Sequence, residues 1–338
     1  MAISNGRFRV VEDGLPQRPH PIGASNWRLP ETGSFDSGGN EMSENGSTLA
    51  RRALGRELRR LRIEKGIFQA AAARAAETSP QSISRIEEGI ATRMTSFQIN
   101  ALCDGYGASD EVRRMLLSLL TESRSNRVHG GGWWRAYADA QIPAGFDHFL
   151  WLEDSAKRFT AWKTGILPGM LQTTEYRRAI AWSEIPQLTS EAVERRLELA
   201  AHRQMRLADN TFEMVALLSE AVIREQVGGP AVMGEQLDHL AELAELPNVS
   251  IRVVPFSAPR HLGPYIGSFS LMEFPVLPES KLTEPPIVYI EEYAGDLYLE
   301  RGAEVQRYRG ALREIEAVAL NEAQSRQRIL AVAKEFGE

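Results

Sequence analysis

Polar side chains that can pair with bases are concentrated in the segment SPQSISRIEEG, residues 79–89. The amide of Gln can bond adenine through two atoms, and the guanidinium of Arg can do the same with guanine in the major groove of DNA. On a helix, one face of this segment would present short polar or forked side chains: Pro80, Gln81, Ser82, Ser84 and Arg85. Their types and spacing favour contact with base edges.

The same segment carries the signals of a short helix. Ser79 is a typical N-cap, and Pro80 fits the first helical turn. Ile83 and Ile86 are spaced to face inward, and Gly89 marks the end. We therefore expect a helix that is apolar on its inner face and polar on its outer face.

The elements that must position this helix lie on both sides of it. Leu54, Leu58 and Leu61 recur with helical spacing, and Gly66 is a candidate C-cap for that first helix. The other helices are expected at Gln69–Ala76, at about 95–104 and at about 109–122. Together they predict an all-α domain of five helices at residues 49–124.

Residues 54–90 resemble the helix-turn-helix of phage repressors, which also defines the xenobiotic-response-element family of bacterial regulators. The motifs that carry the resemblance are L-G-x-x-L-R-x-L-R from Leu54, the Gln that begins the second helix, and S-x-S-R-I-E-x-G from Ser82. The resemblance implies a repressor-like domain that binds double-stranded DNA.

The resemblance also implies a role for individual residues. Positions that read bases are occupied here by Pro80, Gln81, Ser84 and Arg85. Positions that hold the DNA backbone are occupied by Gln69, Ser82, Thr92, Arg93 and Thr95. Glu87 matches a structural position. Two departures from the pattern, Phe68 in place of an N-cap Thr or Ser and the alanine run at 70–76, predict a less stable domain.

Charge is distributed unevenly along the chain. Fourteen basic and nine acidic residues give residues 49–128 a net charge of +5, whereas residues 129–338 carry −9 and the whole chain −6. A basic domain in an otherwise acidic chain is typical of proteins whose partner is a polyanion. A solvated basic face without any partner would have the same composition.

The start of the chain has a different character. Residues 1–48 are rich in Gly, Pro, Ser and Asn and show no apolar period, so we expect a disordered leader. Met42 could be the physiological start, which would leave residues 1–41 outside the native protein. Residues 125–146 are expected to form a connector. The sequence contains neither a membrane-spanning run nor a signal peptide, which favours a cytoplasmic protein associated with the nucleoid.

Residues 147–338 mix helical and strand periods and predict a larger α+β domain with a mostly antiparallel sheet. Helices are expected near 147–162, 173–183, 189–208, 219–227, 230–245, 302–319 and 321–335. Strands are expected at 211–219, 249–256, 267–274, 286–292 and 296–300.

Sequence blocks between about 133 and 330 resemble a domain of unknown function, DUF5753, which is fused to this kind of helix-turn-helix in actinobacterial regulators. The blocks include WLEDSAKRF, ILPGMLQTTEYRRA, GSFSLMEF and VYIEEYAGDLYLE. The resemblance implies a transcription regulator, but it supplies neither a ligand nor a mechanism.

The aromatic residues of this region allow two interpretations, because large rings are enriched both in cores and at binding surfaces. They form the core, or they line a pocket for an effector or partner between the LPGMLQTTEY and RHLGPYIGSF loops. The candidate pocket residues are Trp134, Trp151, Trp162, Leu171, Gln172, Tyr176, Tyr265 and Tyr289.

The sequence contains no recognisable catalytic or metal site. The pairs Glu153-Asp154 and Glu291-Glu292 could act as acid and base, but a helix surface and a strand end explain them better. The six histidines lack metal-ligand spacing, the single Cys103 excludes an intrachain disulfide, and no nucleophile elbow or phosphate loop is found. We expect no enzymatic activity, cofactor or metal.

The sequence thus predicts a regulator that binds a DNA operator and whose C-terminal domain senses a small molecule or a protein partner. The alternative is an antitoxin-like or scaffold protein that binds a small partner protein and regulates its own operon. An enclosed pocket would favour a ligand, and a large exposed apolar patch would favour a protein. We also expect a homodimer, with the apolar residues of 302–319 and 321–335 either forming its seam or packing onto the sheet.

Overall fold

The computed structural model describes residues 49–90, 92–125, 133–137, 140–142, 145–184, 187–292 and 295–337. The predicted leader at 1–48, and half of the predicted connector at 125–146, lie outside these residues.

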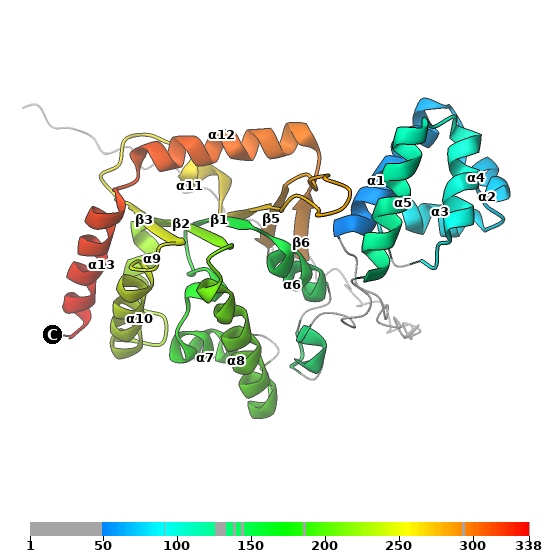
Figure 1. Ribbon diagram of the computed structural model, residues 1–338. Coiled ribbons are helices and arrows are strands. Elements are labelled where there is room, and N and C mark those ends of the chain that lie inside the picture. Colours follow the sequence, from blue (N-terminus) through cyan, green and yellow to red (C-terminus); the bar gives the residue numbers. More distant parts are fainter. Residues whose placement is uncertain are drawn as a thin grey trace, which may run out of the picture. The chain divides into compact units, whose positions relative to one another are not determined.

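The first domain is entirely helical within the described residues (Figure 1). Its helices are α1 Leu49–Glu64, α2 Gln69–Ala75, α3 Pro80–Glu87, α4 Ser96–Tyr106 and α5 Asp110–Ser125. The predicted five-helix domain is thereby confirmed. Leu58 of α1, Ala72 of α2 and Ile83 of α3 are each about 1% exposed and belong to one hydrophobic core. Burial of these apolar side chains holds the three helices together.

Gly55 allows α1 to cross closely over α3. A Cβ atom at this position would lie 2.1 Å from the carbonyl oxygen of Ile86 and 3.1 Å from the backbone of Glu87. Both are backbone atoms at the C-terminal end of α3, so no side-chain rotation could relieve the overlap. The glycine of the L-G-x-x-L motif therefore permits the close contact between the first and third helices.

The second domain is built on a six-stranded mixed sheet with the order β3-β2-β1-β4-β5-β6. The strands are β1 Arg158–Lys163, β2 Glu213–Ser219, β3 Val249–Val254, β4 Phe269–Glu273, β5 Ile287–Glu292 and β6 Gly295–Leu299. The pairs β1–β2 and β2–β3 are parallel, and the pairs β1–β4, β4–β5 and β5–β6 are antiparallel. The prediction of an α+β domain with a mostly antiparallel sheet is confirmed.

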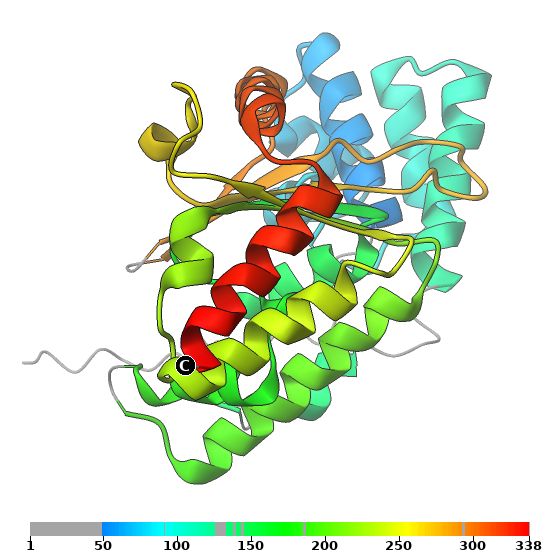
Figure 2. The same cartoon turned by 90° about the vertical axis from the view of Figure 1, so that its left-hand side faces the viewer.

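Helices cover both faces of this sheet. The longer ones are α6 Phe146–Ser155, α7 Thr174–Trp182, α8 Ser190–Gln204, α10 Pro230–Leu243, α12 Gly302–Val318 and α13 Glu322–Gly337. The shorter ones are η1 Trp133–Tyr137, η2 Gly169–Leu171, η3 Met205–Ala208, α9 Glu220–Arg224 and α11 Gly263–Ile266. Figure 1 shows α12 on one face and α6, α7, α8 and α10 on the other, and Figure 2 shows α13 alongside α10.

One predicted element is wrong in its second half. The sequence predicted a helix near 147–162, but α6 ends at Ser155 and residues 158–163 form β1 at the centre of the sheet. Four consecutive residues of β1, from Phe159 to Trp162, are buried, because the strand has helices on both sides. A strand buried on both faces shows no alternation of polar and apolar residues, so its period resembles that of a buried helix.

The predicted dimer seam on the last two helices is also not available. Leu312 and Ile315 of α12 belong to the core on one face of the sheet, and Ile329 and Val332 of α13 belong to the main core. Ile315, Ile329 and Val332 are fully buried within the chain. These side chains pack back onto the sheet, which was the other interpretation of the same pattern.

A Gly55→Ala substitution tests the close crossing of α1 and α3. We expect it to destabilise the helical domain by about 1–3 kcal/mol, because the added methyl group overlaps backbone atoms of α3. Native-state hydrogen exchange of the amides in residues 49–125 would measure this loss separately from the second domain. Gly105→Ala in α4 is the matched control: its Cβ atom would meet only Ala75, at 3.9 Å, so exchange there should be unchanged or slower.

Candidate DNA-binding surface and ligand cavity

The outer face of α3 carries the predicted base-reading residues. Pro80, Gln81 and Arg85 are exposed, and Ser84 is partly exposed. The guanidinium of Arg85 forms no hydrogen bond or ion pair with any described residue. A free, forked donor on an exposed helix face can bond the edge of a guanine without first breaking an internal contact.

The two serines on this helix are less free than the sequence suggested. Ser79 is the N-cap, and its hydroxyl oxygen accepts a hydrogen bond from the backbone N–H of Ser82 at 3.0 Å. The hydroxyls of Ser79 and Ser82 also lie 2.9 Å apart. The hydroxyl of Ser84 donates to Glu88 at 2.8 Å. A contact from Ser84 to DNA would therefore have to share or replace the bond to Glu88.

A buried carboxylate connects α1, α2 and α3 through hydrogen bonds. Glu87 of α3 is 7% exposed, and its two oxygens accept hydrogen bonds from Arg62 of α1 at 2.5 and 2.8 Å. The side-chain amide of Gln69 on α2 donates to the same carboxylate at 3.0 Å. The bonds to Glu87 raise the pKa of the Arg62 guanidinium. Glu87 thus has the structural role that was expected of it, and Arg62, for which the sequence predicted no role, is its partner.

The loop after α3 holds the predicted phosphate contacts. Arg93 is exposed and has no partner among the described residues, whereas the hydroxyl of Thr92 donates to the carbonyl of Ile90 at 3.2 Å. Thr95 is the N-cap of α4 and forms a capping box with Gln98, so its hydroxyl already accepts a bond from the N–H of Gln98.

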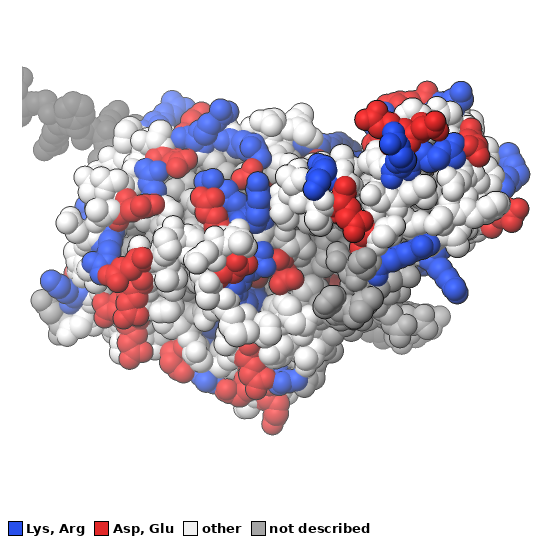
Figure 3. Space-filling model, viewed as in Figure 1, with Lys and Arg blue, Asp and Glu red and all other residues white. Residues whose placement is uncertain are grey.

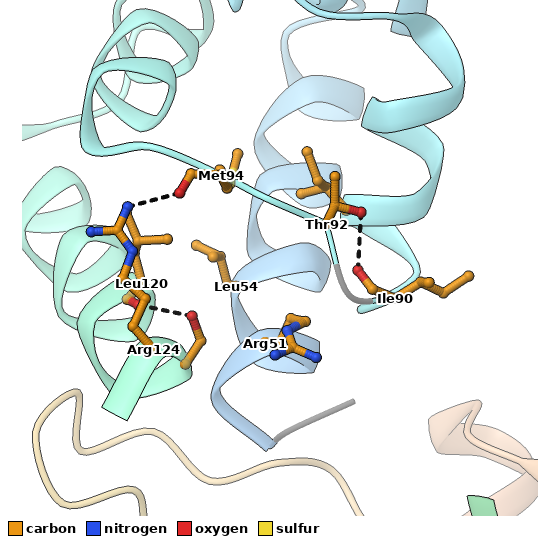
Figure 4. A pocket seen from close by; sticks show the side chains of 9 residues that line it. Arg51, Leu54, Ile90, Thr92, Met94, Leu120 and Arg124 are labelled. Carbon is orange, nitrogen blue, oxygen red and sulfur yellow. Dashed lines mark hydrogen bonds between the residues drawn. The ribbon is translucent and has the colours of Figure 1, made fainter. Parts of the chain in front are cut away.

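This loop is tied to the rest of the helical domain by Arg124. Its guanidinium donates to the carbonyl of Met94 at 2.7 Å, as Figure 4 shows. The small pocket in Figure 4, between α1, the loop and α5, has a volume of about 20 Å³. That is room for about one water molecule and too little for an organic ligand. The pocket therefore does not represent an effector site.

The eight residues predicted to line an effector pocket are not brought together in one cavity. Seven are buried, and Tyr265 is 73% exposed. Trp134, Trp151, Leu171 and Tyr176 lie in the main hydrophobic core. Trp162 and Tyr265 line a groove beside α11, whereas Gln172 and Tyr289 line a separate cavity at the end of β1. Most of these aromatic rings therefore build the fold.

The two carboxylate pairs that were considered for acid–base chemistry do not form a catalytic pair in the structure. The first pair has structural partners, and the second is exposed to solvent. Both oxygens of Glu153 accept bonds from Arg203 at 2.7 Å, and Asp154 accepts a bond from the indole N–H of Trp133. Glu291 and Glu292 are exposed at the end of β5. Among the described residues, no group of His, Cys, Asp and Glu is arranged to hold a metal ion. None of the described helices has the length and hydrophobicity of a membrane span.

Surface charge is mixed on the side of the molecule seen in Figure 3. Lys and Arg alternate with Asp and Glu over both the helical domain and the α+β domain. The net charge of +5 over residues 49–128 is therefore not concentrated on this face of the helical domain.

The fold and the exposed face of α3 define a helix-turn-helix protein of the DNA-binding transcription-regulator class. A family model described as a helix-turn-helix domain matches residues 53–116. A second model, described as a domain of unknown function (DUF5753), matches residues 146–331, which is more than half of the chain. The chain therefore belongs to the DUF5753 family. The comparisons with curated proteins and with solved structures gave no match.

Replacing Glu87 by Gln tests the buried ion pair. The variant leaves the Arg62 cation without its carboxylate, so we expect the helical domain to lose about 3 kcal/mol of stability. Differential scanning calorimetry of the full chain would measure the loss, with the transition of this domain identified as the one that the Gly55 variant shifts. Glu88→Gln removes the neighbouring exposed carboxylate and should change stability by less than about 0.5 kcal/mol. Equal effects of the two substitutions would contradict a special role for Glu87.

Proposed function

We propose that this protein is a sequence-specific regulator that reads a double-stranded DNA operator with α3, and that its C-terminal domain senses a small molecule. The observation that carries the proposal is the unpartnered guanidinium of Arg85 beside the exposed Gln81, on a helix whose other face is anchored by Ile83 and Glu87. Such an arrangement presents base-specific donors on a fixed support.

The DNA backbone contacts that we propose lie at the edges of this helix. Arg93 supplies a free cation, and the N-terminus of α4, capped by Thr95, directs backbone N–H groups outward from the same loop. We also propose hydrogen bonds to phosphates from Ser82, Thr92 and Gln69, each of which would have to share or replace an internal bond. Phosphate contacts of this kind supply affinity, whereas Gln81, Arg85 and their neighbours supply specificity.

Two copies of the chain are proposed to act together on one operator. A single recognition helix contacts only about four or five base pairs, and readers of this type gain specificity by placing two helices about 10 base pairs, or a multiple of that, apart. The apolar side chains of α12 and α13 that were candidates for a dimer interface pack into the hydrophobic core of the chain itself. A dimer would therefore use another surface.

The cavities of the second domain favour a small-molecule effector over a small protein partner. A cavity of about 360 Å³ at the end of β1 adjoins one of about 910 Å³, and both volumes lie within the range of sites for organic ligands. The antitoxin-like alternative requires a large apolar docking patch instead. Recovery of a stoichiometric protein complex, with no response to any ligand, would favour that alternative.

Two arginine substitutions test the assignment of the reading surface. Arg85→Ala should weaken binding to the specific operator by about 1–3 kcal/mol and relax the preference at one base position, because a bidentate contact to a base is lost. Arg93→Ala should weaken binding to all sequences alike and lower the salt dependence by about one charge. Arg114→Ala removes the same charge from α5 instead of from α3 or the loop after it, and is the control. Footprinting and salt titrations would measure these effects, and wild-type affinity in both test variants would rule out this reading face.

The stoichiometry of the complex is a separate prediction. Light scattering of the full-length protein at micromolar concentration, alone and with its operator, should show two chains per site. Selected operators should be near-palindromes with half-sites about one DNA turn, or a multiple of a turn, apart. A single chain bound to an asymmetric site would contradict the proposed dimer but not DNA binding by α3.

A further inference from the structure

The cavity of about 360 Å³ lies at the C-terminal end of β1, on the face of the sheet that is covered by α6, α7 and α8. Its walls come from these helices, from β1, β4 and β5, and from the loop at 164–168 that leads into η2. It shares Arg177, Arg203 and Tyr289 with the adjoining cavity of about 910 Å³. The two spaces together can hold a small organic molecule.

One part of the cavity wall is apolar. Phe146 and Phe149 of α6, Ile166 of the loop, Ile180 of α7 and Tyr289 of β5 line it. The rings of Phe149 and Tyr289 are 4.5 Å apart, and Tyr289 is 3% exposed. This wall can bury the apolar body of a ligand.

Two cations line the same cavity without partners. The side chains of Lys163, at the end of β1, and Arg177, on α7, form no hydrogen bond or ion pair with any described residue. The Nε atom of Arg177 is fully buried and unpaired. Burial lowers the pKa of Lys163, and burial together with the nearby Arg203 lowers the pKa of Arg177 to about 10. Both groups therefore lie where a positive charge is disfavoured and an anion would be stabilised.

The third cation in the wall is already neutralised. Arg203 donates two hydrogen bonds to Glu153, and its guanidinium lies 5.6 Å from the centre of the Phe146 ring and 5.5 Å from that of Phe149. Glu291 also lines the cavity, and its negative charge favours the charged forms of both Lys163 and Arg177, but it forms no hydrogen bond or ion pair with either side chain. Among the groups that line the cavity, Lys163 and Arg177 therefore remain without a carboxylate in contact.

An acceptor in the same wall is also unsatisfied. The side-chain N–H of Gln172 donates to the carbonyl of Leu167 at 2.7 Å, which orients the amide, and its buried Oε1 atom has no donor. Buried polar atoms without partners are rare in folded proteins, and an acceptor of this kind is free to bond a ligand. Gln172 can accept a hydrogen bond from a hydroxyl or amine of a ligand.

We infer that this cavity binds a small organic acid. Its anionic group pairs with Lys163 and Arg177, and its apolar body packs against Phe149, Ile180 and Tyr289. This inference rests on the proposed sensing function and specifies the class of effector. A neutral molecule of the same shape would leave both cations unpaired and would bind more weakly.

Two matched fluorescent probes test the inference on the full-length protein. Anilinonaphthalene sulfonate carries one anionic group on an apolar body, and phenylnaphthylamine has the same body without the charge. We expect the sulfonate to bind at one site per chain, and Lys163→Met and Arg177→Gln each to raise its Kd about tenfold or more, since each removes a charge-assisted contact. The Kd of the neutral probe should not rise in either variant.

Lys157→Met and Arg178→Gln are the matched controls. Lys157 is exposed just before β1, and Arg178 follows Arg177 on α7 but is paired with Glu175 and Glu194 outside the cavity. Neither substitution should change the Kd of the sulfonate. Lys163→Met should also raise the melting temperature of the protein without ligand, because it removes a desolvated, unpaired cation.

The inference would be overturned by the absence of sulfonate binding in the wild type, by the same Kd in all five proteins, or by an equal loss of affinity for the charged and neutral probes. A fall in melting temperature in Lys163→Met would show a structural cation instead. Operator affinity is measured separately, with and without probe. Binding in the cavity that leaves operator affinity unchanged would contradict the proposed sensing function while the anion site stands.

Discussion

The arrangement of α1, α2 and α3 depends on the carboxylate of Glu87. It belongs to α3 and accepts bonds from Arg62 of α1 and Gln69 of α2. A buried carboxylate is tolerated only when it is paired and hydrogen-bonded, so any shift of α3 would leave a charge unsatisfied. Arg85 lies two residues earlier on the same short helix and faces outward. Its position on the outer face of α3 therefore depends on the bonds that Glu87 makes inside the domain.

In the second domain, one charged side chain of the cavity wall is paired, and two others are not. Glu153 and Arg203 are both less than a tenth exposed and form a two-bond pair, which gives the cavity a fixed wall. Lys163 and Arg177 line the same cavity without a carboxylate in contact. Partly buried cations without a contacting carboxylate do not stabilise a fold, whereas they add binding free energy once an anion enters. The contrast between these two sets of charges is the physical basis of the proposed anion site.

The helical domain could be predicted from sequence because helix caps and apolar periodicity depend on neighbouring residues. The cavity could not, because residues far apart in the sequence line it. Ser79 caps α3 as expected, because an N-cap depends only on residues a few positions away. β1 was predicted as helix, because a strand buried on both faces lacks alternation. Lys163 ends that strand, so its place in a cavity with Arg177 could not be foreseen. Gln172 and Tyr289 were selected by residue type and do line it, but the tryptophans selected with them pack elsewhere.

The charge of the chain limits how an effector could control DNA binding. Residues 129–338 carry a net charge of −9, so the second domain is repelled by DNA and the attraction must come from residues 49–128. One further negative charge, buried beside Lys163 and Arg177, is a small addition to −9. Salt also screens interactions between exposed charges beyond about 8 Å. An anionic effector would therefore have to act by binding one conformation or one assembly state more tightly than another, because equal affinity for both shifts no equilibrium.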